Sequence, residues 1–292
     1  GRKFDYMITN PPFGVSWKSE KEFVEEESKN PYGRFSVGTP RSSDGSLLFL
    51  QHLISKMKDE GSRIGIVFNG SPLFTGDGGS GESEIRKWII ENDMLECIVS
   101  LPDSLFFNTG ISTYIWIVTN KKESQRKGKV QLIDGSTFFT QMRKPLGDKR
   151  KTMKSQHIDE IIKLYRERIK SNESKFFEND FFGYTKITIE NPLLENGEVV
   201  TKKDGTPKPN KKLRDNERVP LSENIEEYYN REVKPHLPNS WLDREKDKVG
   251  YEINFTKYFY DYKPLRSIRD ITSDLLELEK ESVGIFKEIV NE

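Results

Sequence analysis

The segment "FDYMITNPPFG" (residues 4–14) joins a short apolar strand to a turn made of Asn10, Pro11, Pro12 and Phe13. One interpretation is purely structural, because Asn-Pro pairs initiate turns and strands often end at them. The other is functional, because ligands of open α/β sheets bind at the carboxyl ends of strands. The rest of the chain has to decide between the two.

The first half of the chain alternates apolar runs of strand length with stretches of helical spacing. Strands are predicted over residues 4–9, 62–68, 95–101, 113–120 and 129–135, and helices over 46–60 and 82–94. Strands that are apolar on both faces and alternate with helices are typical of a mainly parallel sheet covered by helices. The sequence therefore predicts an α/β fold.

The character of the chain changes near residue 140. A basic loop is expected over 141–156, an amphipathic helix over 158–172 and short strands or hairpins over 175–190. A last helix is predicted from about Ser267, with an apolar stripe at spacings of three and four. The stripe comprises Ile268, Ile271, Leu275, Leu278, Ile285 and Ile289. We divide the chain into residues 1–140 and a tail, 141–292, whose helix packs on its own domain or on a partner.

Composition excludes several classes of protein. The one cysteine, Cys97, cannot form an internal disulfide, which favours a cytoplasmic location. The three histidines lack the spacing of metal ligands, so we expect no metal site. No apolar run reaches the roughly 18 residues of a membrane span, so we expect no membrane partner. The net charge of zero does not by itself indicate nucleic acid.

The groups of the turn suit the exocyclic amine of a planar base. Such an amine is a poor nucleophile, because its lone pair is delocalised into the ring. Two acceptors aimed at its N–H bonds would localise the lone pair, and the Asn10 side-chain carbonyl and the Pro11 backbone carbonyl are such acceptors. Pro12 stiffens the turn, and Phe13 offers a face for stacking. A base must leave the duplex to reach such a turn.

At these residues the sequence resembles a known family. "NPPF" after an apolar strand resembles the catalytic motif of amino-group DNA methyltransferases, which use S-adenosylmethionine. Residues 70–121, 181–193 and 249–268 are similar to the methylation (modification) subunit of type I restriction-modification systems, an adenine-N6 DNA methyltransferase. The resemblance implies the C-terminal part of a Rossmann-like methyltransferase sheet, followed by a helical and irregular tail.

The resemblance also implies roles for individual residues. Asn10 and Pro11 hold the adenine N6 amine, Pro12 stiffens the turn, Phe13 stacks on the base, and Asn10 also lies next to the cofactor. The segment "FFNTGI" (106–111) corresponds to a family motif near the target-base pocket, which implies substrate contacts for Phe107 and Thr109. A core aromatic is the alternative for Phe107.

The implied cofactor is S-adenosylmethionine, but its main binding motif is absent from this chain. The family carries that Gly-containing motif upstream of the NPPF strand, and no such motif precedes Asn10. We therefore expect a fragment of a longer protein that alone neither binds the cofactor tightly nor methylates DNA. The edge of the NPPF strand is expected to be unpaired, which invites self-association.

The implied partners are DNA, a specificity subunit that reads the target sequence, and, left open, a restriction nuclease subunit. The last helix is a candidate for docking on the specificity subunit. Between Lys202 and Arg218 there are seven basic residues and three acidic ones. This run fits phosphate contact or a solvated loop.

Other functions remain as alternatives to DNA methylation. Similar motifs occur in enzymes that methylate a protein glutamine or RNA, and a catalytically silent DNA-binding scaffold is a further alternative. A dinucleotide fingerprint, G-x-G-x-x-G, fits "GDGGSG" (76–81), with Glu96 about 20 residues further on. We reject it, because "NGSPLFT" separates these glycines from the preceding strand and Glu96 starts the next strand instead of ending one.

Overall fold

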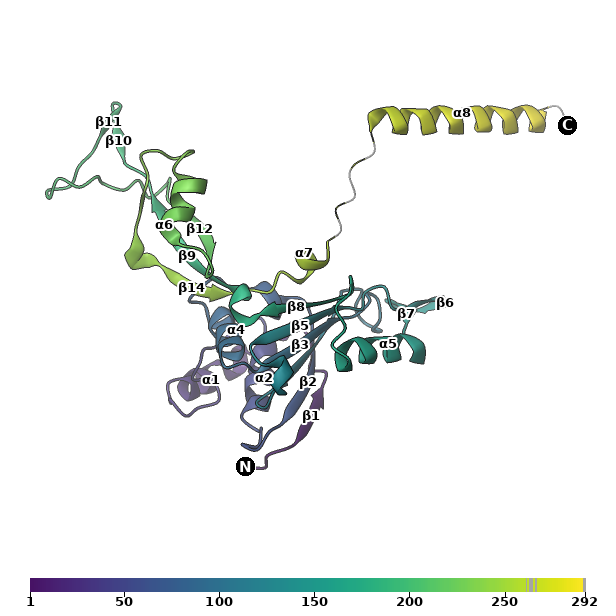
Figure 1. Ribbon diagram of the computed structural model, residues 1–292, viewed down its shortest axis with the longest axis horizontal. Helices are drawn as coiled ribbons and strands as arrows, with labels where there is room; N and C mark the ends of the chain where they lie inside the picture. The colour runs from purple at the N-terminus through teal and green to yellow at the C-terminus, as the bar shows by residue number, and fades with distance from the viewer. Residues whose placement is uncertain (261, 263–264, 266, 291–292) are drawn as a thin grey trace. The chain divides into compact units, whose positions relative to one another are not determined.

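The computed structural model describes residues 1–260, 262, 265 and 267–290 (Figure 1). The chain forms two compact units, Gly1–Phe255 and Thr256–Glu292. The boundary predicted at 140–141 falls inside the first unit, within the strand β6 (Thr140–Leu146), which follows β5 (Lys129–Asp134). Much of the predicted tail is therefore part of the same compact body as the predicted catalytic region.

A six-stranded sheet forms the centre of the first unit. Its order is β1 (Tyr6–Thr9), β2 (Arg63–Phe68), β4 (Tyr114–Thr119), β3 (Leu95–Ser100), β5 and β8 (Ser174–Glu178). Every strand predicted in the first half of the chain is present, and the α/β fold is confirmed. All six residues of β3 are buried, as expected for a strand covered on both faces.

The prediction of mainly parallel pairing is wrong. The pairs β1–β2 and β3–β5 are parallel, whereas β4 is antiparallel to both β2 and β3, and β8 is antiparallel to β5. The segment between β3 and β4 contains no helix. A parallel return needs a crossover, usually a helix, so β4 pairs antiparallel with its predecessor.

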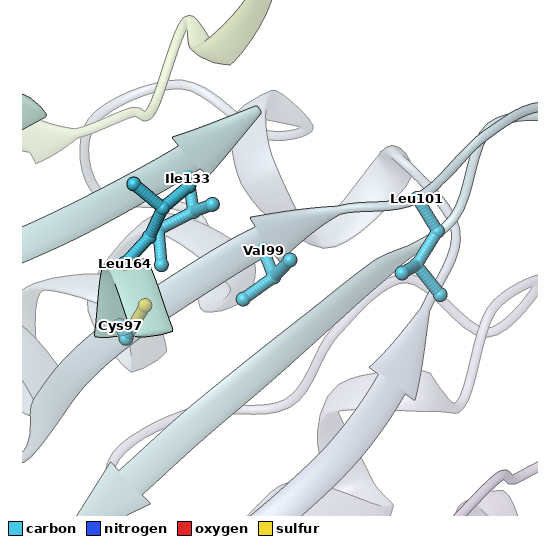
Figure 2. Packing of buried hydrophobic residues seen from close by; sticks show 5 residues of the cluster. All are labelled: Cys97, Val99, Leu101, Ile133 and Leu164. Atoms are coloured by element: carbon cyan, nitrogen blue, oxygen red, sulfur yellow. The ribbon is translucent and has the colours of Figure 1, made fainter. Parts of the chain in front are cut away.

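Helices cover the sheet. The predicted helices are present as α2 (Ser46–Ile54), α4 (Gly81–Glu91) and α5 (Ser155–Arg166), and two more, α1 (Lys21–Ser28) and α3 (Ser71–Phe74), were not predicted. Figure 2 shows part of the packing on one face of the sheet. Cys97 of β3 and Ile133 of β5 lie beside Leu164 of α5, and Val99 and then Leu101 continue the same cluster along the chain. Burial raises the pKa of the Cys97 thiol far above its usual range, so this cysteine serves as a core residue.

A second, antiparallel sheet packs on the first unit's core. Its central strand is β9 (Gly183–Glu190), which pairs with β12 (Asp215–Pro220), β13 (Trp241–Leu242) and β14 (Lys248–Tyr251). Strands were predicted over 175–190, but β8 and β9 belong to different sheets. A two-residue ladder joins β10 (Leu194–Glu195) to β11 (Glu198–Val199), and the short helix α6 (Ile225–Tyr228) follows β12.

The basic segment predicted as a loop is a hairpin. Strand β6 pairs with β7 (Lys149–Thr152), and Gly147 makes the turn with a φ of 61°, a conformation that favours glycine. The strands lack apolar alternation, so local sequence gives no strand signal. The hairpin forms because its backbone bonds to the loop after β3: the Arg150 and Lys151 amides both donate to the Ser104 carbonyl.

The second unit contains the predicted last helix, α8 (Ile268–Val290). The helix α7 (Phe255–Phe259) lies at the boundary of the two units. Along α8, four residues of the predicted stripe are exposed: Ile268, Ile271, Leu275 and Leu278. The side chains of Ile285 and Ile289 lie outside the described part of the chain. The helix is thus confirmed, with an apolar stripe over its first three turns that the second unit itself does not cover.

Candidate active site

A cleft of about 570 Å³ lies at the carboxyl end of β1. It is lined by Asn10, Pro11, Pro12, Phe13, Gly14, Asn69, Phe106, Phe107, Asn108, Thr109 and Ile111. The structure therefore brings together all six residues that the sequence singled out, although the two segments are far apart in the chain. No charged side chain lines the cleft, so it suits a planar, polar but uncharged group.

The turn after β1 is held in place by the segment on its C-terminal side. Pro11 is buried, whereas Asn10 is exposed to the cleft. Gly14 has a φ of 61°, which a residue with a side chain rarely adopts. Trp17 is buried, its amide donates to the Ser42 carbonyl at 3.0 Å, and its indole Nε1 donates to the Arg41 carbonyl at 3.0 Å. The turn is thus fixed at both ends, by a strand and by an anchored tryptophan.

The opposite wall is the loop at 106–111. Phe106 bridges to Thr109 and meets Phe13 edge-to-face, with ring centroids 6.3 Å apart at 86°. This aromatic pair connects the two walls. Thr109 Oγ1 accepts from the Ile111 amide at 3.3 Å, which shapes the loop locally.

Phe107 is 57% exposed, so the alternative of a core aromatic is wrong. Its ring is held from one side, where Lys149 Nζ lies 4.8 Å from the ring centroid. Its carbonyl accepts from the Asp148 amide at 3.2 Å. An exposed ring supported by a cation and by backbone bonds is available for stacking.

Sequence reasoning missed Asn69 and Asn108, which also line the cleft. Asn69 directly follows β2, the parallel neighbour of β1, so both strands end at the same edge of the sheet. The sequence did carry a signal for Asn69: it directly follows a predicted buried strand, as Asn10 directly follows the neighbouring strand β1. Asn69 Oδ1 accepts from the Ser71 amide at 3.2 Å, which fixes one end of the amide. Asn108 gave no signal beyond its place in "FFNTGI".

The glycine-rich loop lies elsewhere and has a packing role. Helix α3 separates it from β2, and none of its residues lines the cleft. A Cβ on Gly81 would lie 1.8 Å from the Thr39 carbonyl oxygen, and one on Gly78 would lie 3.0 Å from the Lys248 carbonyl oxygen. These glycines let the loop approach the backbone of neighbouring segments, which supports the rejection of a dinucleotide site.

Glu96, the acid of the rejected fingerprint, is also a structural residue. It is buried, and Arg63 Nη2 donates to its Oε2 at 3.1 Å. The Tyr165 hydroxyl also donates to this carboxylate, and burial together with that bond raises the tyrosine's pKa above its usual range. A carboxylate that is enclosed and paired in this way cannot bind a ribose.

The described residues show no group of three or more His, Cys, Asp or Glu side chains arranged to hold a metal ion. Among the same residues, no helix has both the length and the hydropathy needed to cross a membrane. The groups that line the cleft are amide, carbonyl, hydroxyl, aliphatic and aromatic groups.

Comparison with known proteins identifies the class to which this fold and cleft belong. The profile of the N-6 DNA Methylase family matches residues 1–201, and the chain belongs to this family. The resemblance inferred from the motifs is thereby confirmed.

Two relatives are more particular. The chain is 27% identical over 198 residues to the type I restriction enzyme MjaIX methylase subunit of Methanocaldococcus jannaschii, covering 68% of this chain and 34% of that protein. It is 36% identical over 134 residues to the type I restriction enzyme HindI methylase subunit of Haemophilus influenzae, covering 46% and 28% of the two chains. The chain thus spans about a third or less of the length of these relatives.

A solved structure shares the fold. The type I restriction-modification methyltransferase subunit from Streptococcus thermophilus superposes with a TM-score of 0.51 at 26% identity, over 62% of this chain and 36% of that one. The likeness supports the assignment of the α/β fold to a methyltransferase subunit.

Proposed function

We propose that the intact protein transfers a methyl group from S-adenosylmethionine to N6 of adenine in DNA, as the modification subunit of a type I restriction-modification system. The observation that carries this proposal is the cleft that joins Asn10–Phe13 to Phe107 and Thr109 at the carboxyl end of β1. Membership of the N-6 DNA methylase family and the type I methylase relatives support adenine as the target base.

Four residues of the cleft have a direct task in this reaction. The flipped adenine amine has two N–H groups. One donates a hydrogen bond to the side-chain carbonyl of Asn10, and the other donates to the backbone carbonyl of Pro11. This would localise the nitrogen lone pair. The amine nitrogen would then bond to the methyl carbon as the bond between that carbon and the cofactor's sulfur breaks, which leaves a neutral thioether. The nitrogen would release one proton to solvent, because no basic side chain lines the cleft. Phe13 and Phe107 hold the plane of the base, so that proximity and orientation contribute to the rate. The preorganised turn reduces the reorganisation that the reaction needs.

The cofactor supplies an electrophilic methyl group when it is bound. The cleft fits the amine end of the reaction, because it is uncharged and rich in amide and carbonyl acceptors. It lacks a carboxylate for the ribose hydroxyls among the residues that line it. The residues that would hold the ribose of the cofactor are therefore not among those that line this cleft.

The substrate class separates this proposal from its alternatives. Intact protein is incubated with S-adenosylmethionine carrying a labelled methyl group and, in separate reactions, with duplex DNA, RNA or a glutamine-containing protein substrate. We expect label in DNA alone. Label in RNA or protein would replace the proposed function with one of the alternatives. Binding of DNA with no transfer to any acceptor would indicate the silent scaffold.

For assembly, we propose that α8 docks on the specificity subunit through its apolar stripe. Ile271, Leu275 and Leu278 are 44%, 61% and 60% exposed, which is unusual for a stripe at helical spacing. Sequence recognition would then come from the partner.

The double substitution Leu275→Asp and Leu278→Asp is expected to abolish co-purification with the specificity subunit, because it places charges in an apolar interface. The control is Glu279→Gln on the same helix, which changes a charge without adding one to the stripe. Size-exclusion chromatography of the mixed subunits measures the outcome. Unchanged assembly of the Asp variant, or of a chain that ends before Ser267, would contradict the docking role of α8.

A further inference from the structure

We propose that the β6–β7 hairpin (140–152) is a phosphate-binding arm that holds the DNA strand beside the cleft. Nothing in the predicted chemistry of the turn or in the family membership assigns a role to this hairpin. The inference rests on the proposed function, because it takes the cleft to receive a flipped base.

The hairpin is anchored to the wall of the cleft. The Asp148 amide donates to the Phe107 carbonyl at 3.2 Å, and the Arg150 amide donates to the Ser104 carbonyl at 2.9 Å. A Cβ on Gly147 would lie 3.0 Å from the same Phe107 carbonyl, so the hairpin turn lies directly on the loop. Whatever the hairpin binds is therefore held next to a residue that lines the cleft.

The hairpin is strongly basic. Over residues 140–152 there are five basic side chains, Arg143, Lys144, Lys149, Arg150 and Lys151, and one acidic side chain, Asp148. A segment with this balance attracts a polyanion.

Two of these lysines serve the structure. Lys149 lies over the ring of Phe107, and Lys151 pairs with Asp103 and lies 4.1 Å from the ring centroid of Phe139. Arg143, Lys144 and Arg150 are exposed, and no carboxylate in the described part of the chain pairs with any of them. Three unneutralised charges are thus presented on a hairpin whose backbone is anchored to the cleft loop, which reduces the ordering cost of binding phosphate.

The other basic run, between Lys202 and Arg218, differs in place and in charge balance. Arg214 pairs with Glu190 at 2.6 Å, and Arg218 pairs with Asp77 at 2.5 Å and with Glu252 at 2.6 Å. Its backbone joins the segment after β9, where the Leu193 amide donates to the Lys208 carbonyl, and none of its residues lines the cleft. Its exposed Lys202, Lys203 and Lys208 offer a control that removes the same number of positive charges at a different position.

Extruding a base requires the backbone on either side of it to be held. Phosphate contacts position the strand without reading its sequence, and each contact releases counterions. The arm therefore predicts a salt-dependent contribution to DNA binding that is independent of the target sequence.

The test uses the intact protein and a short DNA duplex, with fluorescence anisotropy between about 50 and 200 mM salt. The triple substitution Arg143→Ala, Lys144→Ala and Arg150→Ala is compared with Lys202→Ala, Lys203→Ala and Lys208→Ala. We expect the hairpin variant to lower the slope of log K against log salt by about 2 to 3, at roughly 0.9 for each phosphate contact, and to weaken binding about 10- to 100-fold. The control variant should keep the slope of the wild type.

Methyl-transfer kinetics provide a second measurement on the same variants. The hairpin variant is expected to raise KM for DNA while kcat at saturating DNA is retained, because the arm binds phosphate and does not touch the reacting atoms. Equal salt slopes for wild type and hairpin variant would overturn the proposal, as would an equal loss in the control variant. A changed slope in a protein that transfers no methyl group would sustain the arm and reject the proposed function.

Discussion

Asn10→Ala is expected to lower kcat for methyl transfer by about 10²- to 10³-fold, a loss typical for removal of one preorganised polar group at a reacting centre. Asn10 is exposed to the cleft at the end of β1, where its side-chain carbonyl is the proposed acceptor for one amine N–H bond. Without that acceptor the lone pair of the adenine amine remains delocalised. DNA affinity should stay unchanged, because phosphate contacts and not the cleft supply most of it.

Two further variants show whether the acceptor is responsible. Asn10→Asp keeps an oxygen acceptor at the same place and should retain more activity than Asn10→Ala. Asn172→Ala removes an exposed asparagine that does not line the cleft and should leave the rate unchanged. Single-turnover methylation with saturating DNA measures all three. A rate for Asn10→Ala within about twofold of the wild type would remove Asn10 from the reaction, because an acceptor at the reacting centre contributes far more.

Arg86→Ala is expected to lower the free energy of unfolding by about 3 to 5 kcal/mol, because it removes a buried donor from several carbonyls and leaves a cavity. The Arg86 side chain is buried, and it donates to the backbone carbonyls of Tyr251 at 2.6 Å, Thr75 at 2.7 Å, and Pro72 and Gly76 at 3.1 Å. One side chain on α4 thereby joins the glycine-rich loop to β14 of the second sheet.

The size of this effect depends on the groups that the substitution leaves without a partner. Burial lowers the pKa of Arg86 to about 10, so the guanidinium is still protonated at neutral pH and its bonds are charge-assisted. Alanine leaves four carbonyls without this donor and opens a cavity. Lys87→Ala, next to it on α4 and half-buried, is the matched control. Denaturant unfolding measures both, and a loss below about 0.5 kcal/mol for Arg86→Ala would contradict its proposed role.

Much of the main sheet could be predicted from local sequence. The runs at 62–68, 95–101 and 129–135 are apolar and bounded by turn residues, and each became a strand within one residue of the predicted ends. The turn at Asn10–Phe13 could also be predicted as a candidate site, because its residue types and its place after a strand are local properties. Its association with Phe107 and Thr109 came from family resemblance alone.

The rest depends on contacts that local sequence does not encode. The direction of β4 results from a connection too short for a helical crossover, and the β6–β7 hairpin forms through bonds to Ser104 and Phe107. The second sheet was not predicted as a unit, because β9 pairs with strands far along the chain. Asn69 could be assigned to the cleft only from the structure, because the assignment depends on the parallel pairing of β1 with β2.

Strand β1 lies at one edge of the main sheet. Among the described residues β1 pairs only with β2, and its Tyr6 and Ile8 are 75% and 91% exposed. The expected unpaired edge is thus present in this chain, and self-association of residues 1–292 through it stays a prediction.

The most direct measurement identifies the atom that receives the methyl group. Intact protein, assembled with its specificity subunit, is incubated with duplex DNA and S-adenosylmethionine bearing a deuterated methyl group, and the digested nucleosides are resolved by mass spectrometry. The account predicts label on N6-methyladenine, and far less of it when Asn10 is replaced by Ala. Label on a cytosine, or label on adenine that persists at the wild-type level without Asn10, would contradict the claim that this cleft activates the adenine amine.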